Sequence, residues 1–161
     1  MEKTNPFLTK IRAREERILP TTVRKYSYDL FLSFPDEDKQ LATTLHDCLR
    51  KRCASTWFSK EELRKGSSIM ATINEAMLCS KNAVILLTPH TLAEARHFPL
   101  LEIYALYNQF LYNELEQIFM VYHQVDHRFI VRHLPLLADH YSFSTQQGLA
   151  NIAAEITTMI A

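Results

Sequence analysis

The sequence predicts an α/β domain built on a five-stranded parallel sheet with helices on both faces. Short apolar segments rich in Val, Ile, Leu and Phe alternate along the chain with segments whose apolar residues recur at helical spacing. The apolar segments are nearly unbroken, which is typical of strands covered on both sides. Right-handed connections between parallel strands then place helices on both faces of the sheet.

Composition and charge exclude several classes of protein. The 161 residues fit one domain, and 47% hydrophobic with 22% charged residues is ordinary for a globular protein. The 18 basic and 18 acidic residues give no net charge, so we expect no nucleic-acid partner. No apolar run approaches the ~20 residues of a membrane span and no secretory signal is visible, so we expect no membrane partner and a cytoplasmic location. The three cysteines include no CxxC pair and are typical of reduced thiols.

The first part of the chain contains one strand and one helix. Residues 1–25 are polar and mixed in charge, and they form either a flexible leader or a short helix. The folded domain covers residues 26–161. Its first strand is the apolar run at 28–34, which Pro35 ends. Acidic residues at 36–38 then open a helix, because carboxylates are favoured near the positive end of the helix dipole.

Two strands and a helix follow in the middle of the chain. Residues 55–59 form a short second strand, and a polar segment at 60–68 leads into an amphipathic helix at 69–80. The strand at 83–88 is the most hydrophobic of the chain, and Pro89 ends it. This alternation continues the βαβ pattern.

The last third contains a helix, a strand, a loosely helical connector, a short strand and a final amphipathic helix. These elements cover residues 99–115, 117–122, 127–139, 140–143 and 146–160. Pro99 suits the first position of the first of these helices, where its missing N–H costs nothing. Glu102 lies off the apolar stripe of that helix and in its first turn, where an acid is also common without any function.

Five segments, taken in order, resemble those of a TIR domain of the bacterial kind. They are YDLFLSF (28–34), WFSKEELRKGSSI (57–69), NAVILLTP (82–89), FPLLEIYAL (98–106) and IFMVYHQVDHRFIVRHLPLLAD (118–139). The resemblance implies a flavodoxin-like three-layer sandwich with strand order 2-1-3-4-5. On such sheets ligands bind outside the carboxyl ends of the strands, where the winding direction reverses, which here is between the first and third strands.

The resemblance also implies an activity. Enzymatic TIR domains cleave the nicotinamide–ribose bond of NAD+, and some cyclise the ADP-ribose product. Their key glutamate follows a tryptophan in the pattern W-P-x-x-E, whereas this chain has Phe98-Pro99-Leu100-Leu101-Glu102. The resemblance therefore implies that Glu102 is catalytic, with phenylalanine in place of the tryptophan. NAD+ would be a substrate, and no cofactor is expected.

Further contacts are expected around the crevice and on one loop. The residues expected to contact the substrate are Ser33, Phe34, Asp36, Thr88 and Phe98. The resemblance assigns to a loop that contacts neighbouring subunits the residues Glu62, Leu63, Arg64, Lys65 and Gly66. An ordinary solvated loop is the alternative interpretation of that segment.

The sequence lacks the residues that several other kinds of functional site need. With only two glycines, the chain has no GxGxxG or Walker-type loop. A phosphate receiver domain would need an aspartate at the end of the third strand, where Thr88 stands. His123 and His127 have no third ligand spaced nearby, so we expect no metal site.

Two functions remain open at the level of sequence. The first is an NAD+ glycohydrolase that gives nicotinamide and ADP-ribose or a cyclic isomer, activated by self-assembly in bacterial antiphage defence or as a toxin effector. The second is a non-catalytic module for TIR–TIR interaction in signalling. Glu102 and Pro99 favour the enzyme, and Phe98 favours the interaction module.

Overall fold

A five-stranded parallel sheet forms the centre of the protein. The computed structural model describes residues 26–58, 69–92, 98–112 and 114–161, and for residues 69–71, 92 and 98–101 it describes the backbone alone. The strands are β1 (Tyr28–Ser33), β2 (Thr56–Trp57), β3 (Ser80–Leu87), β4 (Ile118–Tyr122) and β5 (Tyr141–Ser144). They lie in the order β2-β1-β3-β4-β5 and all pair in parallel. The predicted fold class and strand order are therefore confirmed.

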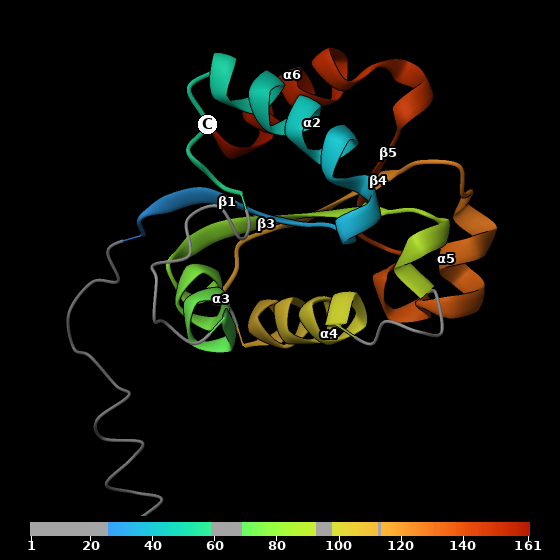
Figure 1. Cartoon of the computed structure of the whole chain (residues 1–161), viewed down its shortest axis with the longest axis horizontal. Coiled ribbons are helices and arrows are strands. Elements are labelled where there is room, and N and C mark those ends of the chain that lie inside the picture. Colours follow the sequence, from blue (N-terminus) through green and yellow to red (C-terminus); the bar gives the residue numbers. More distant parts are fainter. Residues whose placement is uncertain (1–25, 59–68, 93–97, 113) are drawn as a thin grey trace, which may run out of the picture.

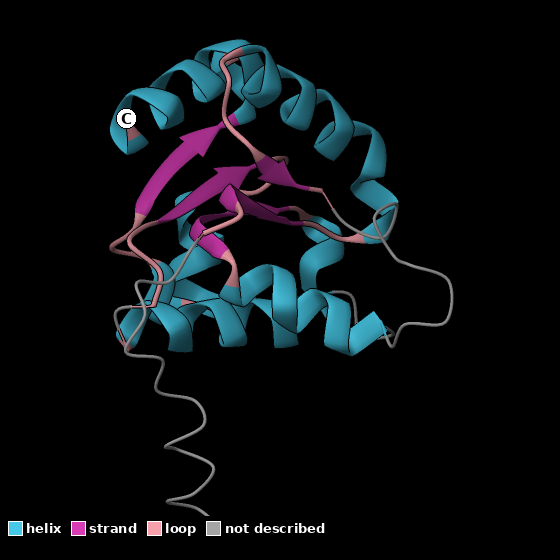
Figure 2. Cartoon of the chain, turned by 90° about the vertical axis from the view of Figure 1, so that its left-hand side faces the viewer, coloured by secondary structure: helices cyan, strands magenta, loops and turns pink. Residues whose placement is uncertain are grey.

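Helices cover both faces of the sheet, which gives three layers (Figures 1 and 2). The α-helices are α2 (Lys39–Lys51), α3 (Ile69–Leu78), α4 (Phe98–Leu111), α5 (His127–His133) and α6 (Leu149–Ile160). Short 3-10 turns are η1 (Asp36–Asp38), η3 (Pro89–Leu92), η4 (Pro135–Leu137) and η5 (Thr145–Gln147). Helices α2 and α6 lie together on one face, and α3, α4 and α5 lie on the other.

Side chains along each strand alternate between two apolar cores, as the pleat of a strand requires. The sheet contributes to the core under α2 and α6 the residues Leu30, Leu32, Val84, Leu86, Phe119, Val121 and Phe143. It contributes to the core under α3, α4 and α5 the residues Phe31, Trp57, Ala83, Ile85, Leu87, Ile118, Met120 and Tyr122. The same alternation directs Ser33 toward α4 and Thr88 toward α2.

The short edge strand β2 is fixed to β1 by one aspartate. The Asp29 carboxylate accepts hydrogen bonds from the backbone N–H of Ser55 (2.8 Å) and from its hydroxyl (2.9 Å). Phe31 and Trp57 then stack with ring centroids 4.9 Å apart and nearly parallel planes. These contacts hold a strand of two residues in register with its neighbour.

Several predicted element boundaries are wrong, and two of them have a clear physical reason. The sequence predicts Ser80 at the end of a helix, but Ser80 is the first residue of β3 and pairs with Tyr28 of β1. The Ser80 hydroxyl donates to the carbonyl of Ala76 (2.7 Å), which satisfies the helix end as the strand begins. The helix predicted to reach residue 115 ends at Leu111, because Leu115 leaves it to pack in the core.

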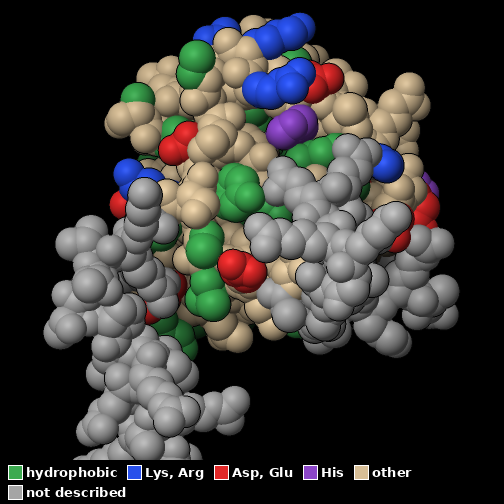
Figure 3. All heavy atoms as spheres, turned by 60° about the vertical axis from the view of Figure 1, so that its left-hand side comes forward, with side chains coloured by type: hydrophobic (Ala, Val, Ile, Leu, Met, Phe, Trp, Pro, Cys, Tyr) green, Lys and Arg blue, Asp and Glu red, His purple; other side chains and the backbone are tan. Residues whose placement is uncertain are grey.

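Surface charge follows the helix dipole at the end of α2. Figure 3 shows Lys and Arg side chains gathered at the top of the face that it draws, over this helix end. Arg50 and Lys51 form the last turn of α2, and Arg52 is its C-cap. Cations are favoured there because the carbonyl end of a helix is partly negative.

Among the described residues, no helix has both the length and the apolar character needed to cross a membrane.

Gly148 separates η5 from α6. Its φ of 90° and ψ of 135° lie in a region that residues with a Cβ rarely adopt. The sequence predicts one continuous helix over residues 146–160, but this backbone turn divides the segment in two.

Replacing this glycine should weaken the fold. We expect Gly148→Ala to lower the free energy of unfolding by about 1–3 kcal/mol, because the native φ is strained for alanine. Urea unfolding followed by circular dichroism measures the change. The control is Ala150→Ser, at an exposed position in the following helix. An unchanged midpoint for Gly148→Ala would show that the turn carries no such strain.

His140 links the stability of the fold to pH. Its ring lies 4.7 Å from the ring of Phe110 in an edge-on arrangement and also meets Tyr107 edge-on. Burial among these rings lowers the pKa of His140 below its usual value of 6.5, and the nearby Asp139 carboxylate opposes this only in part. The unfolded chain therefore takes up the proton at a higher pH than the folded chain.

Stability should fall as the pH drops below about 6.5, because protonation of His140 then favours the unfolded chain. Above that pH the ring is neutral in both states and has no such effect. We expect His140→Phe to lose less stability than the wild type between pH 7.5 and pH 5.5, measured as the change in urea midpoint. Equal losses in both proteins would exclude His140 as a source of the pH dependence.

Candidate functional site

The winding direction of the sheet reverses between β1 and β3. The chain leaves β1 through α2 toward β2 and later returns to β3, on the other side of β1. Because all five strands are parallel, the loops that follow β1 and β3 meet at the same edge. This edge is the place where ligands bind on sheets of this kind.

A serine and a glutamate form the first polar contact at this edge. The Ser33 hydroxyl, at the end of β1, donates a hydrogen bond of 2.7 Å to Oε2 of Glu102 in α4. Ser33 is 2% exposed, and Glu102 is partly buried. The sequence predicted both residues for the same site, and the structure brings them together although they are 69 positions apart.

The position of Glu102 in its helix differs from the predicted one. Helix α4 begins at Phe98, so Glu102 is its fifth residue and the first turn contains no acid. The prediction that Glu102 lies in the first turn is therefore wrong. The effect of the helix dipole falls off within that turn, whereas the hydrogen bond from Ser33 holds the carboxylate directly.

A second polar contact lies on the opposite face of the same edge. The Thr88 hydroxyl donates to Oδ2 of Asp38 (2.6 Å), and Nδ1 of His90 lies 3.1 Å from Oδ1 of the same carboxylate. The backbone N–H of His90 donates to the Thr88 hydroxyl (3.1 Å). Asp38 is 9% exposed and Thr88 is fully buried, so this carboxylate is enclosed by its partners.

The other predicted substrate contacts are spread over the two faces. Phe34 packs on the α2 side, where its ring stacks on Phe58 with centroids 5.4 Å apart. Asp36 is exposed at the start of η1. Thr88 uses its hydroxyl on Asp38, so a substrate would reach it only by displacing a buried partner. These three substrate contacts stay predictions.

Several predicted residues lie outside the described part of the structure. Phe98 begins α4, but its side chain is not among the described ones. The predicted assembly residues 62–66 and the predicted leader at 1–25 also lie outside the described residues. Their roles and the domain boundary at residue 26 stay predictions.

Sequence reasoning missed two features at the same end of the sheet. His90 was not predicted as a site residue, although its position directly after the predicted strand end at Thr88-Pro89 was a usable signal. At the ends of β4 and β5, His123 contacts Thr145 (2.9 Å between Nδ1 and Oγ1). Beside that contact a groove of about 450 Å³ is lined by Gln124, Val125, Asp126, Phe129, Ser144, Thr145 and Gln146.

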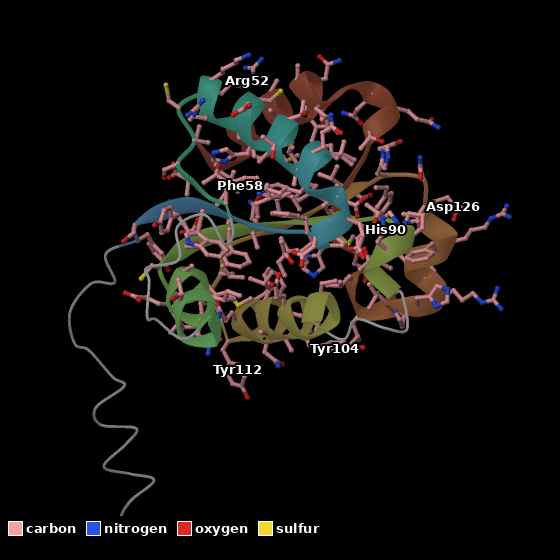
Figure 4. All side chains as sticks on the ribbon, in the orientation of Figure 1. Arg52, Phe58, His90, Tyr104, Tyr112 and Asp126 are labelled. Atoms are coloured by element: carbon pink, nitrogen blue, oxygen red, sulfur yellow. The ribbon has the colours of Figure 1, made fainter. Side chains whose placement is uncertain are left out.

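Figure 4 shows His90 and Asp126 toward the same end of the sheet. Within the described ranges, no three His, Cys, Asp or Glu side chains gather as metal ligands would. What this edge offers chemically is a carboxylate fixed by a serine, with a second, buried carboxylate fixed by a threonine and a histidine.

Comparison with known proteins gives one family. A family model described as TIR domain matches residues 30–155. The chain is 25% identical over 135 residues to NAD(+) hydrolase PdTIR of Paracoccus denitrificans (strain Pd 1222), a match that covers 83% of this chain. It spans only 44% of that relative's length.

Two solved structures share the fold. A metazoan TIR-STING receptor from C. gigas gives a TM-score of 0.66 at 18% identity, covering 89% of this chain and 43% of that one. The TIR domain of the Toll-related receptor TRR-2 from Hydra magnipapillata gives a TM-score of 0.62 at 13% identity. This match covers 83% of this chain and 98% of that one. At these identities the likeness concerns the fold alone, whereas the family model covers most of the chain. The chain belongs to the TIR domain family.

Proposed function

We propose that this chain cleaves the nicotinamide–ribose bond of NAD+, with Glu102 as the catalytic carboxylate. The observation that carries the proposal is the hydrogen bond of 2.7 Å by which Ser33 holds Glu102 at the edge where the sheet reverses its winding. The relative named as an NAD(+) hydrolase supports the choice of substrate. Because this chain spans less than half of that relative, the activity is proposed for this chain on the strength of its own site.

The reaction suits a site with one oriented carboxylate. Nicotinamide leaves NAD+ as a neutral molecule from a cationic ring, so no acid is needed to protonate it. Positive charge instead develops on the ribose at C1′, and a fixed negative charge stabilises it most when the charge needs no reorientation. The hydrogen bond from Ser33 supplies that fixed orientation.

The remaining substrate contacts belong to the same proposal. Ser33 positions the carboxylate, and the exposed Asp36 lies in the loop that follows β1. Phe34, Thr88 and Phe98 complete the predicted set. Phe98 stands where the W-P-x-x-E pattern has tryptophan, and as an aromatic residue it keeps a ring face for stacking.

Self-assembly is the proposed route to activation. The loop residues Glu62, Leu63, Arg64, Lys65 and Gly66 would contact a neighbouring copy. The product would be ADP-ribose or a cyclic isomer, in bacterial antiphage defence or as a toxin effector.

A second candidate function is a non-catalytic module for TIR–TIR interaction. The observation that favours it is a group of large apolar side chains exposed on α4, directly after α4 and on η4. These are Tyr104 at 52%, Leu111 at 55%, Tyr112 at 79% and Leu136 at 67%. An apolar cavity of about 120 Å³ lies between α4 and η4 beside this surface. Exposed apolar surface of this kind favours association with a partner whether or not the chain is catalytic.

One enzymatic comparison separates the two candidates. Concentrated protein is incubated with NAD+, with and without a crowding agent, and nicotinamide release is followed by chromatography. We expect release by the wild type and a loss of roughly 10²–10³-fold in Glu102→Gln, because the amide keeps the shape but not the charge. Glu155→Gln, at an exposed acid on α6, is the matched control and should match the wild type.

Two results would count against the proposal in different ways. No nicotinamide release by concentrated wild-type protein would overturn NAD+ cleavage and leave the interaction module. Equal release by Glu102→Gln and the wild type would overturn the role of Glu102 alone.

A further inference from the structure

Asp38 and His90 form a carboxylate–imidazole pair that the proposed chemistry at Glu102 does not use. Nδ1 of His90 lies 3.1 Å from Oδ1 and 3.3 Å from Oδ2 of Asp38. The carboxylate is buried, whereas the imidazole side chain is 48% exposed. The pair therefore has one buried end that is fixed and one end that meets solvent.

The contact with Asp38 sets which ring nitrogen is available. An ionised carboxylate only accepts hydrogen bonds, so Nδ1 must carry the hydrogen that joins the two groups. In the neutral imidazole, Nε2 then carries the lone pair. Within the described part of the chain Nε2 has no hydrogen-bond partner, and it lies on the side of the ring away from the buried carboxylate.

Thr88 and Thr91 make this arrangement rigid. The Thr88 hydroxyl donates to Asp38 and accepts from the backbone N–H of His90, so it ties the acid to the turn that bears the histidine. The Thr91 hydroxyl accepts from the backbone N–H of Thr88 (3.0 Å), and Thr91 is 1% exposed. A carboxylate that fixes the tautomer and orientation of an imidazole is the arrangement that prepares histidine as a general base.

The elements that bear His90 and Glu102 are neighbours in the fold. Turn η3, which bears His90, contacts α4, which bears Glu102. Asp38 belongs to the segment that leaves β1 five residues after Ser33. Both polar contacts therefore belong to the carboxyl ends of two adjacent strands, one on each face of the sheet.

We propose that His90 is the general base that activates the nucleophile after nicotinamide has left, and that Asp38 and Thr88 are its positioning residues. The proposal rests on NAD+ cleavage at Glu102. In the step, the C1′–N bond has broken and its electron pair has left with nicotinamide. A water oxygen then forms a bond to C1′, and the proton that this water loses passes to Nε2 of His90.

This division of labour follows from the chemistry of the two half-reactions. Breaking the bond to nicotinamide needs negative charge near C1′ but no proton transfer, which suits the carboxylate of Glu102. Attack by water releases a proton, which needs a base within hydrogen-bond reach. A pyridine base attacks C1′ through a nitrogen that carries no hydrogen, so exchange of nicotinamide for such a base needs no general base.

Competition between water and a pyridine base therefore tests His90. NAD+ is incubated with the full chain and 3-acetylpyridine, and ADP-ribose and the exchanged dinucleotide are both measured. We expect His90→Gln to form ADP-ribose roughly 100-fold more slowly while it forms the exchanged dinucleotide at the wild-type rate. His133→Gln, at an exposed histidine on α5, is the matched control and should change neither product.

A second variant tests the positioning role. Asp38→Asn removes the acceptor that fixes Nδ1, and we expect the product ratio to shift toward exchange in the same direction as in His90→Gln. Thermal melting followed by circular dichroism checks that both variants are folded. A shift in product ratio is measured within the active molecules, so a loss of folded protein cannot produce it.

The outcomes distinguish this inference from the proposed function. If the wild type releases nicotinamide and the two products fall together in folded His90→Gln, His90 is not the base and the inference is overturned. An unchanged product ratio in His90→Gln overturns it as well. If the wild type releases no nicotinamide, NAD+ cleavage fails and this inference fails with it.

Discussion

Burial of the strands on both faces is the constraint on which the rest of the structure depends. The apolar side chains of β1 and β3 point alternately into the two cores, and the polar residues lie toward the strand ends. Ser33 and Thr88 occupy those ends and point to opposite faces of the sheet. Each then pairs with a carboxylate from a neighbouring segment, Ser33 with Glu102 and Thr88 with Asp38. The two polar contacts therefore lie on opposite faces because side chains alternate between the faces along each strand.

Much of this architecture could be predicted from the sequence, and the rest could not for physical reasons. Unbroken apolar runs define the strands, and the family resemblance supplies their order. The contact between Ser33 and Glu102 follows once both are placed at one edge. By contrast, the contact between His90 and Asp38 depends on a turn of four residues that brings the imidazole against the carboxylate. Apolar periodicity carries no information about such a turn, and the same holds for the start of β3 at Ser80.

The proposed function depends on one question: whether the oriented carboxylate of Glu102 is sufficient for NAD+ cleavage when Phe98 stands in place of the family's tryptophan. In the described site, Ser33 orients Glu102, and the turn after β3 bears the imidazole that pairs with Asp38. A module used only for interaction would have no need for either contact, although both also stabilise the edge of the sheet. The exposed apolar side chains on α4, such as Tyr104, fit an assembly in either case. The proposals of catalysis and of assembly therefore do not exclude each other.

The measurement that tests the central claim most directly is a crystal structure with carba-NAD+, a hydrolysis-resistant analogue in which a methylene group replaces the ring oxygen of the nicotinamide ribose. The account predicts that C1′ of this analogue lies about 3–3.5 Å from a carboxylate oxygen of Glu102, close enough for the fixed negative charge to stabilise the positive charge that develops at C1′. It also predicts that the nicotinamide ribose lies at the carboxyl ends of β1 and β3. An analogue bound in the groove beside Asp126, with Glu102 remote from C1′, would contradict the account.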